Sequence, residues 1–186
     1  MKKLYHGSLS VFDEIDLSAG RGYKDFGKGF YATAVEKHAE RLAIRNREIL
    51  IKRHNVLKAK NASLKLASVM AYRYNLLYNE NSLESLKIKE FMTADAEWLR
   101  FIVANRKSPV SVHNYDIVIG PTADAQTTMI INEYMEELEE SGFREDICDK
   151  VIAELMPENL SKQYFFGTTR ALKTLEFDKI KRQVIL

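Results

Sequence analysis

The sequence predicts a single α+β domain with antiparallel strands, and three observations lead to this prediction. Segments rich in β-branched and aromatic residues are spread along the whole chain and do not alternate strictly with helical segments, which argues against a doubly wound parallel sheet. The 186 residues, 46% of them hydrophobic, are enough to bury one sizeable core. We find no Pro/Gly/Ser-rich linker and no internal repeat, which favours one domain over residues 1–186.

The strands are predicted from β-branched and aromatic runs bounded by glycine and proline. The first is expected at 3–8 and the second at 29–33, after a loop that carries three glycines. The clearest buried strand is 115–120, a β-branched run closed by Gly120-Pro121. Further strands are expected at 66–77, 83–88, 163–167, 175–177 and 184–186.

The helices are predicted from caps and from apolar residues at helical spacing. Thr33 and Glu36 have the spacing of a capping box, so a helix is expected to begin there and to run past Arg45. The segment from there to 66 is open between further helix and a basic insertion. Thr93 is expected to cap a helix that stops before Pro109. Three further helices are expected: one marked by Ile130, Tyr134 and Leu138, one marked by Ile147, Val151, Ile152 and Leu155, and a short one at 168–174.

The composition argues against several classes of protein. The formal net charge of +2 is too small to indicate nucleic-acid binding, and no apolar run is long enough to span a membrane. The single cysteine, Cys148, and the absence of an apolar leader at the start predict a cytoplasmic protein. The sequence contains no P-loop, no zinc-protease motif, no nucleophile elbow and no Rossmann glycine pattern, and we predict no metal site.

Charge is nevertheless uneven along the chain. A basic segment is formed by Lys52, Arg53, His54, Lys58, Lys60 and Lys65, and an acidic one by Glu136, Glu137, Glu139 and Glu140. Because no aromatic residues interleave with the bases, we predict that the basic segment is a solvated or partner-facing surface and not a nucleic-acid groove. A domain that binds RNA or DNA through 52–65 is the alternative.

The first candidate for a functional role is the segment His6-Gly7-Ser8 inside the first strand. Glycine weakens a strand, so its presence there suggests a close approach. One explanation is a flat ligand whose carboxamide exchanges hydrogen bonds with the Gly7 backbone, next to His6. A β-bulge at Gly7 and a histidine satisfied within the protein explain the same pattern.

A second segment, Asp25 to Tyr31 with the sequence DFGKGFY, follows after a loop and precedes a helix that contains Ala39. The two segments in this order resemble the NAD site of the diphtheria-toxin and poly(ADP-ribose) polymerase branch of the ADP-ribosyltransferases. The resemblance implies two antiparallel sheets around an NAD cleft, with flanking helices and with NAD as the substrate.

The resemblance also implies roles for individual residues. His6 would hold the adenine-side ribose, Gly7 would pair with the nicotinamide amide through its backbone, and Tyr31 would stack on the nicotinamide ring. His38 stands where the family often has a serine that touches the amide. The remaining residues implied to line the NAD site are Ser8, Asp25, Gly29 and Phe30.

The third element of the family site is a glutamate at the start of a late strand, and the matching position is Gln163. A glutamine can hydrogen-bond the nicotinamide ribose, but it carries no charge to stabilise an oxocarbenium-like centre. With Gln163, Tyr31 and His6 as catalytic residues, the resemblance predicts a mono-ADP-ribosyltransferase. The alternatives are an NAD-binding module with little or no activity, and an NAD glycohydrolase.

Similarity to one bacterial family of this superfamily extends along the rest of the chain, through Trp98, Asn105-Arg106, 115–121 and Gln163-Tyr164. Some members of that family sit beside small proteins in toxin–antitoxin-like pairs. The resemblance therefore implies a macromolecular acceptor, such as a protein, and a small antitoxin-like partner.

Three polar residues in these segments have simpler interpretations. From the sequence we expect Asn105 to be a helix C-cap, Arg106 a solvated charge and Asp116 an Asx turn at the start of a strand. The alternative for Arg106 is that it lines the site.

Overall fold

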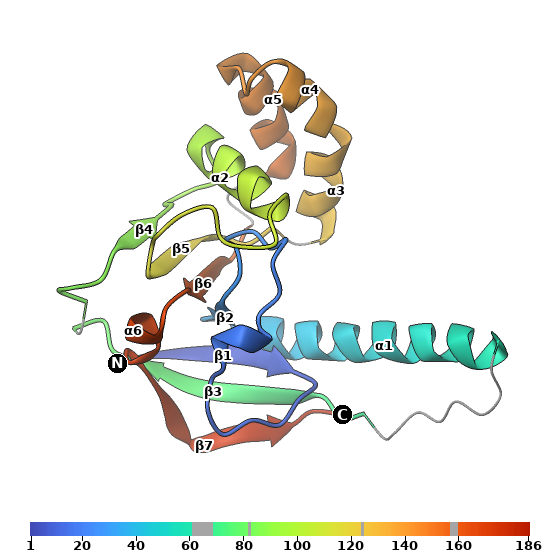
Figure 1. Cartoon of the computed structure of the whole chain (residues 1–186), viewed down its shortest axis with the longest axis vertical. Coiled ribbons are helices and arrows are strands. Elements are labelled where there is room, and N and C mark those ends of the chain that lie inside the picture. Colours follow the sequence, from blue (N-terminus) through green and yellow to red (C-terminus); the bar gives the residue numbers. More distant parts are fainter. Residues whose placement is uncertain (61–68, 82, 124, 157–159) are drawn as a thin grey trace. The chain divides into compact units, whose positions relative to one another are not determined.

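The computed structural model describes residues 1–60, 69–81, 83–123, 125–156 and 160–186 (Figure 1). The chain forms two compact units, each assembled from separate stretches of sequence. Unit 1 consists of Met1–Ile15, Ala32–Ser82 and Thr174–Leu186, and unit 2 consists of Asp16–Tyr31 and Leu83–Lys173. The single domain over residues 1–186 stays a prediction.

The fold is α+β, as the sequence predicts, but its strands do not form two antiparallel sheets. Hydrogen bonds link the seven strands found in the described residues in the order β4-β5-β6-β2-β1-β3-β7, and β4 and β5 run parallel. The result is one mixed sheet. The strand β2 (Phe30–Thr33) contributes its first two residues to unit 2 and its last two to unit 1.

Unit 1 is built on three antiparallel strands, β1 (Lys2–Ser8), β3 (Tyr72–Tyr78) and β7 (Leu175–Val184). β1 pairs with β3 along its whole length, from Lys2 with Tyr78 to Ser8 with Tyr72. β7 covers the other edge of β3, and a register shift between Tyr74 and Leu76 lets one long strand follow it. β1 pairs with β2 at Tyr5 and Thr33.

The long helix α1 (Glu36–Lys60) packs on β1 at Gly7. A Cβ atom at Gly7 would lie 2.1 Å from the carbonyl oxygen of Ala39 and 3.1 Å from the backbone nitrogen of Ala43. Ala39 and Ala43 are themselves buried. Small residues on both elements therefore let the helix backbone come close to the strand.

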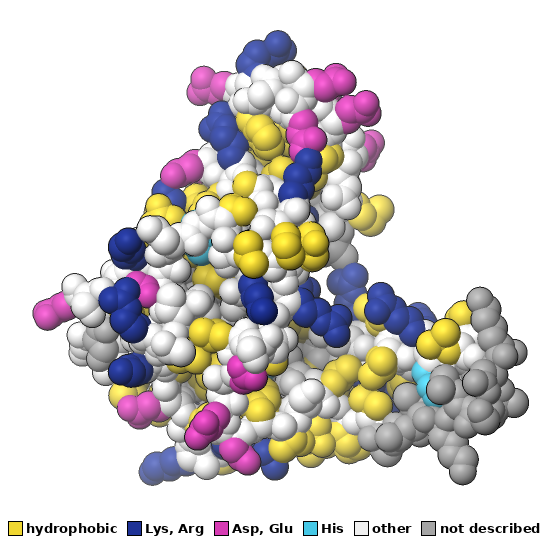
Figure 2. Space-filling model, viewed as in Figure 1, with side chains coloured by type: hydrophobic (Ala, Val, Ile, Leu, Met, Phe, Trp, Pro, Cys, Tyr) yellow, Lys and Arg dark blue, Asp and Glu magenta, His cyan; other side chains and the backbone are white. Residues whose placement is uncertain are grey.

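Unit 2 combines the strands β4 (Ile88–Glu90), β5 (Ile117–Pro121) and β6 (Lys162–Phe166) with helices. β5 and β6 are antiparallel, and Gly120 pairs with Gln163. The helical segments are η1 (Leu17–Ala19), α2 (Ala96–Arg106), α3 (Ala125–Glu133), α4 (Met135–Glu140), α5 (Glu145–Leu155) and α6 (Thr169–Leu172). Asp and Glu side chains gather over α4 and α5 in Figure 2, as the acidic run 136–140 predicts.

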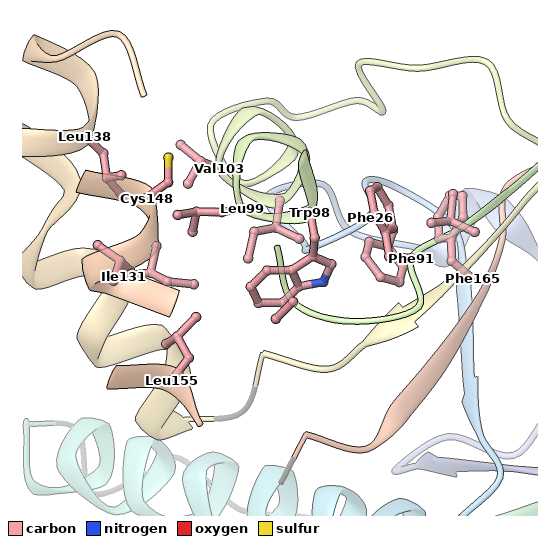
Figure 3. Packing of buried hydrophobic residues seen from close by; sticks show 14 residues of the cluster. Phe26, Phe91, Trp98, Leu99, Val103, Ile131, Leu138, Cys148, Leu155 and Phe165 are labelled. Atoms are coloured by element: carbon pink, nitrogen blue, oxygen red, sulfur yellow. The ribbon is translucent and has the colours of Figure 1, made fainter. Parts of the chain in front are cut away.

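The core of unit 2 joins the helices to the strands. Trp98 and Leu99 of α2 face Ile131, Cys148 and Leu155 of the neighbouring helices, while Phe26, Phe91 and Phe165 continue the cluster toward the strands (Figure 3). The indole nitrogen of Trp98 donates to the carbonyl of Pro121 at 3.1 Å, so the largest buried side chain has its polar atom satisfied.

The predicted elements are mostly found, with corrections at their ends and one division. The helix marked by Ile130, Tyr134 and Leu138 is two helices, α3 and α4, with Tyr134 between them. The segment 83–88 is not a strand as a whole, because β4 covers only Ile88–Glu90, and α2 is capped by Asp95 and not by Thr93. The predicted strands 175–177 and 184–186 belong to one strand, β7, that ends at Val184. The helix after Thr33 runs to Lys60, and part of the predicted strand 66–77 lies outside the described residues.

The predicted capping box is also corrected. Thr33 Oγ1 accepts from the backbone of Val35 at 3.1 Å, but Glu36 forms an ion pair with Arg73 and does not turn back to Thr33.

Across the described ranges, none of the helices is both long enough and apolar enough to cross a membrane.

Candidate functional site

The predicted site residues fall into two groups. His6, Gly7, Ser8 and His38 belong to unit 1, whereas Asp25, Gly29, Phe30, Tyr31 and Gln163 belong to unit 2. Each group is described within its own unit.

The loop that carries Asp25 is fixed by the segment 108–113 of the same unit. Tyr23 donates its backbone N–H to Ser108 at 2.8 Å, Lys28 donates to Ser111 Oγ at 3.0 Å, and His113 Nε2 bonds the carbonyl of Phe26 at 2.9 Å. Gly27 has a φ of 89°, and a Cβ there would lie 2.3 Å from Ser111 Oγ. The loop thus requires glycine at this position for both conformation and space.

The central contact of unit 2 is an ion pair between Asp25 and Arg106, the last residue of α2. Nε of Arg106 lies 2.8 Å and Nη2 lies 2.7 Å from Asp25 Oδ1, and each of the two side chains is only 14% exposed. Nη2 also donates to Thr128 Oγ1 at 3.0 Å. Arg106 is therefore not the solvated charge expected from the sequence. Its ion pair with Asp25, a predicted site residue, favours the alternative that Arg106 lines the site.

Gln163 lies on the other side of the same carboxylate. Its Nε2 donates to Asp25 Oδ2 at 2.9 Å and approaches the carbonyl of Pro121 at 3.4 Å. Within the described part of the chain, Gln163 Oε1 accepts no hydrogen bond, so it stays free to accept one from a ligand hydroxyl. The backbone of Ala123 donates to Asp25 Oδ2 at 3.3 Å and completes the set.

Tyr31 stands beside this cluster with its phenol turned inward. The hydroxyl donates to the carbonyl of Gly27 at 2.7 Å and accepts from the backbone of Phe26 at 3.0 Å. Its ring meets Phe165 edge-on, with centroids 5.3 Å apart. Burial, and then the negative charge of Asp25, raise the pKa of Tyr31 well above its usual value. The hydroxyl therefore holds the loop as a neutral group.

One guanidinium nitrogen of Arg106 makes no hydrogen bond within the described residues. This nitrogen, Nη1, is buried. Buried polar groups in proteins are nearly always paired, so an unpartnered guanidinium nitrogen is an exception that needs an explanation.

In unit 1, the neighbouring residues His6 and Gly7 lie on opposite faces of β1, as alternation along a strand requires. The ring of His6 packs among aromatic residues, 5.9 Å from Phe12 and 6.4 Å from Tyr74. The missing side chain of Gly7 is explained by α1, which occupies that space with Ala39. The packing of a helix, and not only a ligand, thus accounts for a glycine inside this strand.

The other two predicted residues of unit 1 differ in their setting. Ser8 Oγ is engaged locally, donating to the carbonyl of Ser10 at 3.1 Å and accepting from its backbone N–H at 3.0 Å. His38 lies in the first turn of α1, directly before Ala39.

Asn105 and Asp116 are structural, though not in the way the sequence suggests. Asn105 is buried inside α2 and ties the helix to the next loop, where its Oδ1 accepts from the backbone of Val112 at 3.2 Å. Asp116 does stand at the start of a strand, but its carboxylate binds distant partners: the backbone of Lys87 at 2.8 Å, Thr168 at 2.6 Å and Arg170 at 2.9 Å.

The arrangement in unit 2 can present a carboxylate, an amide oxygen and a buried guanidinium N–H to one polar ligand. The sequence predicts Asp25 and Gln163 as site residues, whereas it offers Arg106 only as an alternative and gives no signal for Thr128. The signal for Arg106 was a charge at the end of an otherwise apolar helix face.

Comparison with known proteins adds a family but no activity. A family model described as "Protein of unknown function (DUF3990)" matches residues 2–177. No curated protein and no solved structure matches the chain.

Proposed function

The chain belongs to the DUF3990 family, and from the residues of the site we propose that it is an NAD-binding mono-ADP-ribosyltransferase with slow turnover. The proposed fold is that of the ADP-ribosyltransferases, and the proposed compartment is the cytoplasm. One observation carries the proposal. The Asp25 carboxylate lies 2.9 Å from the Gln163 amide, so a negative charge stands beside the position where the resembling family has its glutamate.

The chemistry follows from the bond that must break. The bond between the ribose C1′ and the nicotinamide nitrogen breaks with its electron pair leaving on nicotinamide, and C1′ gains oxocarbenium character. An acceptor nucleophile then bonds to C1′ and loses a proton to solvent. A carboxylate in a water-poor site stabilises the developing positive charge. Gln163 Oε1 is available to accept from a ribose hydroxyl, and Arg106 Nη1 to donate to an oxygen of NAD.

The same geometry argues for a slow reaction. Arg106 pairs with Asp25 at 2.7 Å and neutralises part of the charge that the oxocarbenium centre needs. This ion pair favours a second candidate, an NAD-binding module with little or no chemistry. If water is the acceptor, the activity is that of an NAD glycohydrolase.

The first experiment measures nicotinamide release by the wild type and by four variants: Gln163→Ala, Gln163→Glu, Asp25→Asn and the double variant Asp25→Asn/Gln163→Glu. Gln163→Ala and Asp25→Asn should each lower the rate by about tenfold or more. Gln163→Glu should gain little, because it places a second carboxylate against Asp25. The double variant moves the charge to position 163 without that repulsion and should release nicotinamide fastest.

The outcomes separate the candidates. Equal rates in the wild type, Gln163→Ala and Asp25→Asn would mean that the reactive centre is elsewhere. NAD binding without release in any of the five proteins would support the binding module.

Binding itself is tested by calorimetry with NAD. Tyr31→Ala should weaken binding by about 1–3 kcal/mol through loss of a stacked ring. Tyr31→Phe is the matched control, since it keeps the ring and removes only the hydroxyl that binds Gly27. Absence of binding at millimolar NAD would refute the NAD proposal, including the roles that the resemblance assigns to His6 and Gly7.

The acceptor and partners remain part of the proposal: a macromolecule, such as a protein, that receives ADP-ribose, and a small antitoxin-like protein. Mass spectrometry after incubation with NAD and cell extract should detect an added ADP-ribose on the acceptor. Release of free ADP-ribose alone would identify a glycohydrolase.

A further inference from the structure

The long helix α1 carries exposed aliphatic residues that follow a regular spacing. Leu42, Ile49 and Val56 are seven residues apart, and Leu50 and Leu57 form a parallel pair. Their exposed fractions are 49%, 37% and 61%, and 40% and 55%. Residues at this spacing lie on one side of a helix. We call these five residues the α1 aliphatic face.

This face continues the stripe by which α1 packs in unit 1. Ala39 and Ala43 are buried against β1, and Leu50 and Leu57 follow on the same side of the helix at steps of seven. In Figure 1, α1 extends well past the strands of its own unit. The stripe therefore changes from buried alanines to exposed leucines along a single helix.

Basic residues flank the face on one side, and the exposed Arg53 lies between its two aliphatic rows. Arg41, Arg45 and Lys52 are exposed and lie next to the row formed by Leu42, Ile49 and Val56. Between 41 and 57 the helix has five Lys or Arg residues and a single acid, Glu48. Figure 2 shows Lys or Arg side chains and hydrophobic side chains together along α1.

We propose that the α1 aliphatic face binds an amphipathic helix of a partner protein, one whose apolar stripe is flanked by Asp and Glu. Aliphatic residues at i, i+7 and i+8 form a stripe on one side of a helix, against which the apolar stripe of a second helix can pack. Arg41, Arg45 and Lys52 are positively charged, so the flank of the partner helix that contacts them should be acidic. The proposal does not depend on the proposed activity.

A second copy of this chain fits the face less well. Pairing α1 with α1 would bring two basic rows together. The acidic helices α4 and α5 bury their own aliphatic residues, since Leu138, Val151 and Leu155 are at most 4% exposed, and so have no apolar stripe to offer.

Nucleic acid and membrane surfaces also fit less well. Phosphate binding has no use for five exposed aliphatic side chains. α1 contains no aromatic residue, although aromatic residues commonly anchor an amphipathic helix at a bilayer and stack on the bases of single-stranded nucleic acid.

The experiment selects binders to the full chain from a displayed library of helices of about 20 residues. The helices carry an aliphatic heptad stripe and flanks varied among acidic, neutral and basic residues. Acidic flanks should be enriched, and the selected peptides should bind Ile49→Gln/Val56→Gln and Arg45→Glu/Lys52→Glu at least about tenfold more weakly than the wild type. All four positions are exposed, so neither variant should disturb folding.

Two controls change the same chemistry elsewhere. Met129→Gln removes an aliphatic residue that is 72% exposed, and Arg21→Glu reverses an exposed charge in a loop. Both should bind the selected peptides like the wild type.

The proposal is overturned if no peptide is enriched over the Ile49→Gln/Val56→Gln protein, or if neutral or basic flanks are enriched. It is also overturned if the aliphatic variants abolish binding to RNA, to vesicles with anionic lipid or to a second copy in sedimentation, while leaving peptide binding unchanged.

Discussion

Two arginines in this protein have opposite settings, one in each unit. Arg73 of unit 1 uses all three guanidinium nitrogens. It bonds Asn75 at 3.1 Å, Glu40 at 2.6 Å and Gln183 at 2.7 Å, and it also pairs with Glu36. Arg106 of unit 2 uses two nitrogens, on Asp25 and Thr128, and leaves Nη1 buried without a partner in the described residues.

The difference teaches how to separate a structural arginine from a binding one. Arg73 holds β3, α1 and β7 together, and each of its three guanidinium nitrogens has a partner. Arg106 is held just as firmly by Asp25, but its remaining donor has no structural use, and a buried donor without a partner is unfavourable unless something binds it.

Arg73→Ala should lower the free energy of unfolding by about 3–5 kcal/mol, because it leaves two carboxylates without their partner at a position that is 8% exposed. Denaturant unfolding measures this loss. The matched control is Arg144→Ala, whose ion pair with Asp146 is more than 60% exposed on both sides, so that its loss should leave the free energy of unfolding nearly unchanged. If the two variants lost the same free energy of unfolding, the proposed structural role of Arg73 would be wrong.

Asp25→Asn should lower the free energy of unfolding by about 2–3 kcal/mol, because the Arg106 guanidinium then lacks its counter-charge. It should also lower the pKa of Tyr31, although burial will keep that pKa above the usual value. A Tyr31 whose pKa is raised on folding stabilises the protein below pH of about 10, and this contribution is lost as the pH rises further. Tyrosine titration by NMR, with Tyr31→Phe to assign the signal, checks the direction. An unchanged Tyr31 pKa would mean that the Asp25 charge does not reach the ring.

Arg106→Lys should change NAD binding more than stability. Lysine can keep the charge on Asp25 but has no second terminal nitrogen in the position of Nη1, so the NAD affinity should fall by about tenfold, or about 1.4 kcal/mol. Arg73→Lys is the matched substitution and should lower stability while changing NAD affinity by less than about twofold. Calorimetry and denaturant unfolding of both variants decide the matter. If Arg73→Lys weakened NAD binding and Arg106→Lys lowered stability instead, Arg73 would be the binding arginine and Arg106 the structural one.

The His113→Gln substitution should change the pH dependence of the free energy of unfolding, and this effect should be smaller than those above. Burial lowers its pKa, partly opposed by its bond to the Phe26 carbonyl. A histidine whose pKa is depressed on folding contributes stability above its unfolded value of about 6.5, and that contribution is lost as the pH falls. The free energy of unfolding should therefore decrease below about pH 6.5 more in the wild type than in His113→Gln. Parallel pH profiles would show that the Asp25 loop is not held by a neutral His113.

Elements with a strong local signal could be predicted from the sequence. All five residues of β5 are buried, and a continuous β-branched run encodes that burial directly. β4 could not be placed, because Ile88-Lys89-Glu90 has no strand pattern and owes its conformation to parallel pairing with β5. The continuity of β7 could not be predicted either, because the polar residues between Phe177 and Arg182 lie at the register shift, where β7 departs from regular pairing with β3.

The candidate site shows the same limit. Asp25 and Gln163 entered as separate positions through a family resemblance, and the contact between them spans 138 residues of sequence. No spacing rule encodes such a contact, and the pairing of Arg106 with Asp25, 81 residues away, is likewise visible only in the fold.

Because unit 1 consists of three separate stretches of sequence, its strands leave the ribosome at different times during synthesis. β1 and β3 have both left the ribosome when Tyr78 has, but β7 begins only at Leu175. At roughly 5–20 residues per second, the intervening residues take on the order of ten seconds to synthesise. During that time β3 presents a bare edge to every neighbouring nascent chain, so the interval before β7 emerges is when this protein most needs a chaperone.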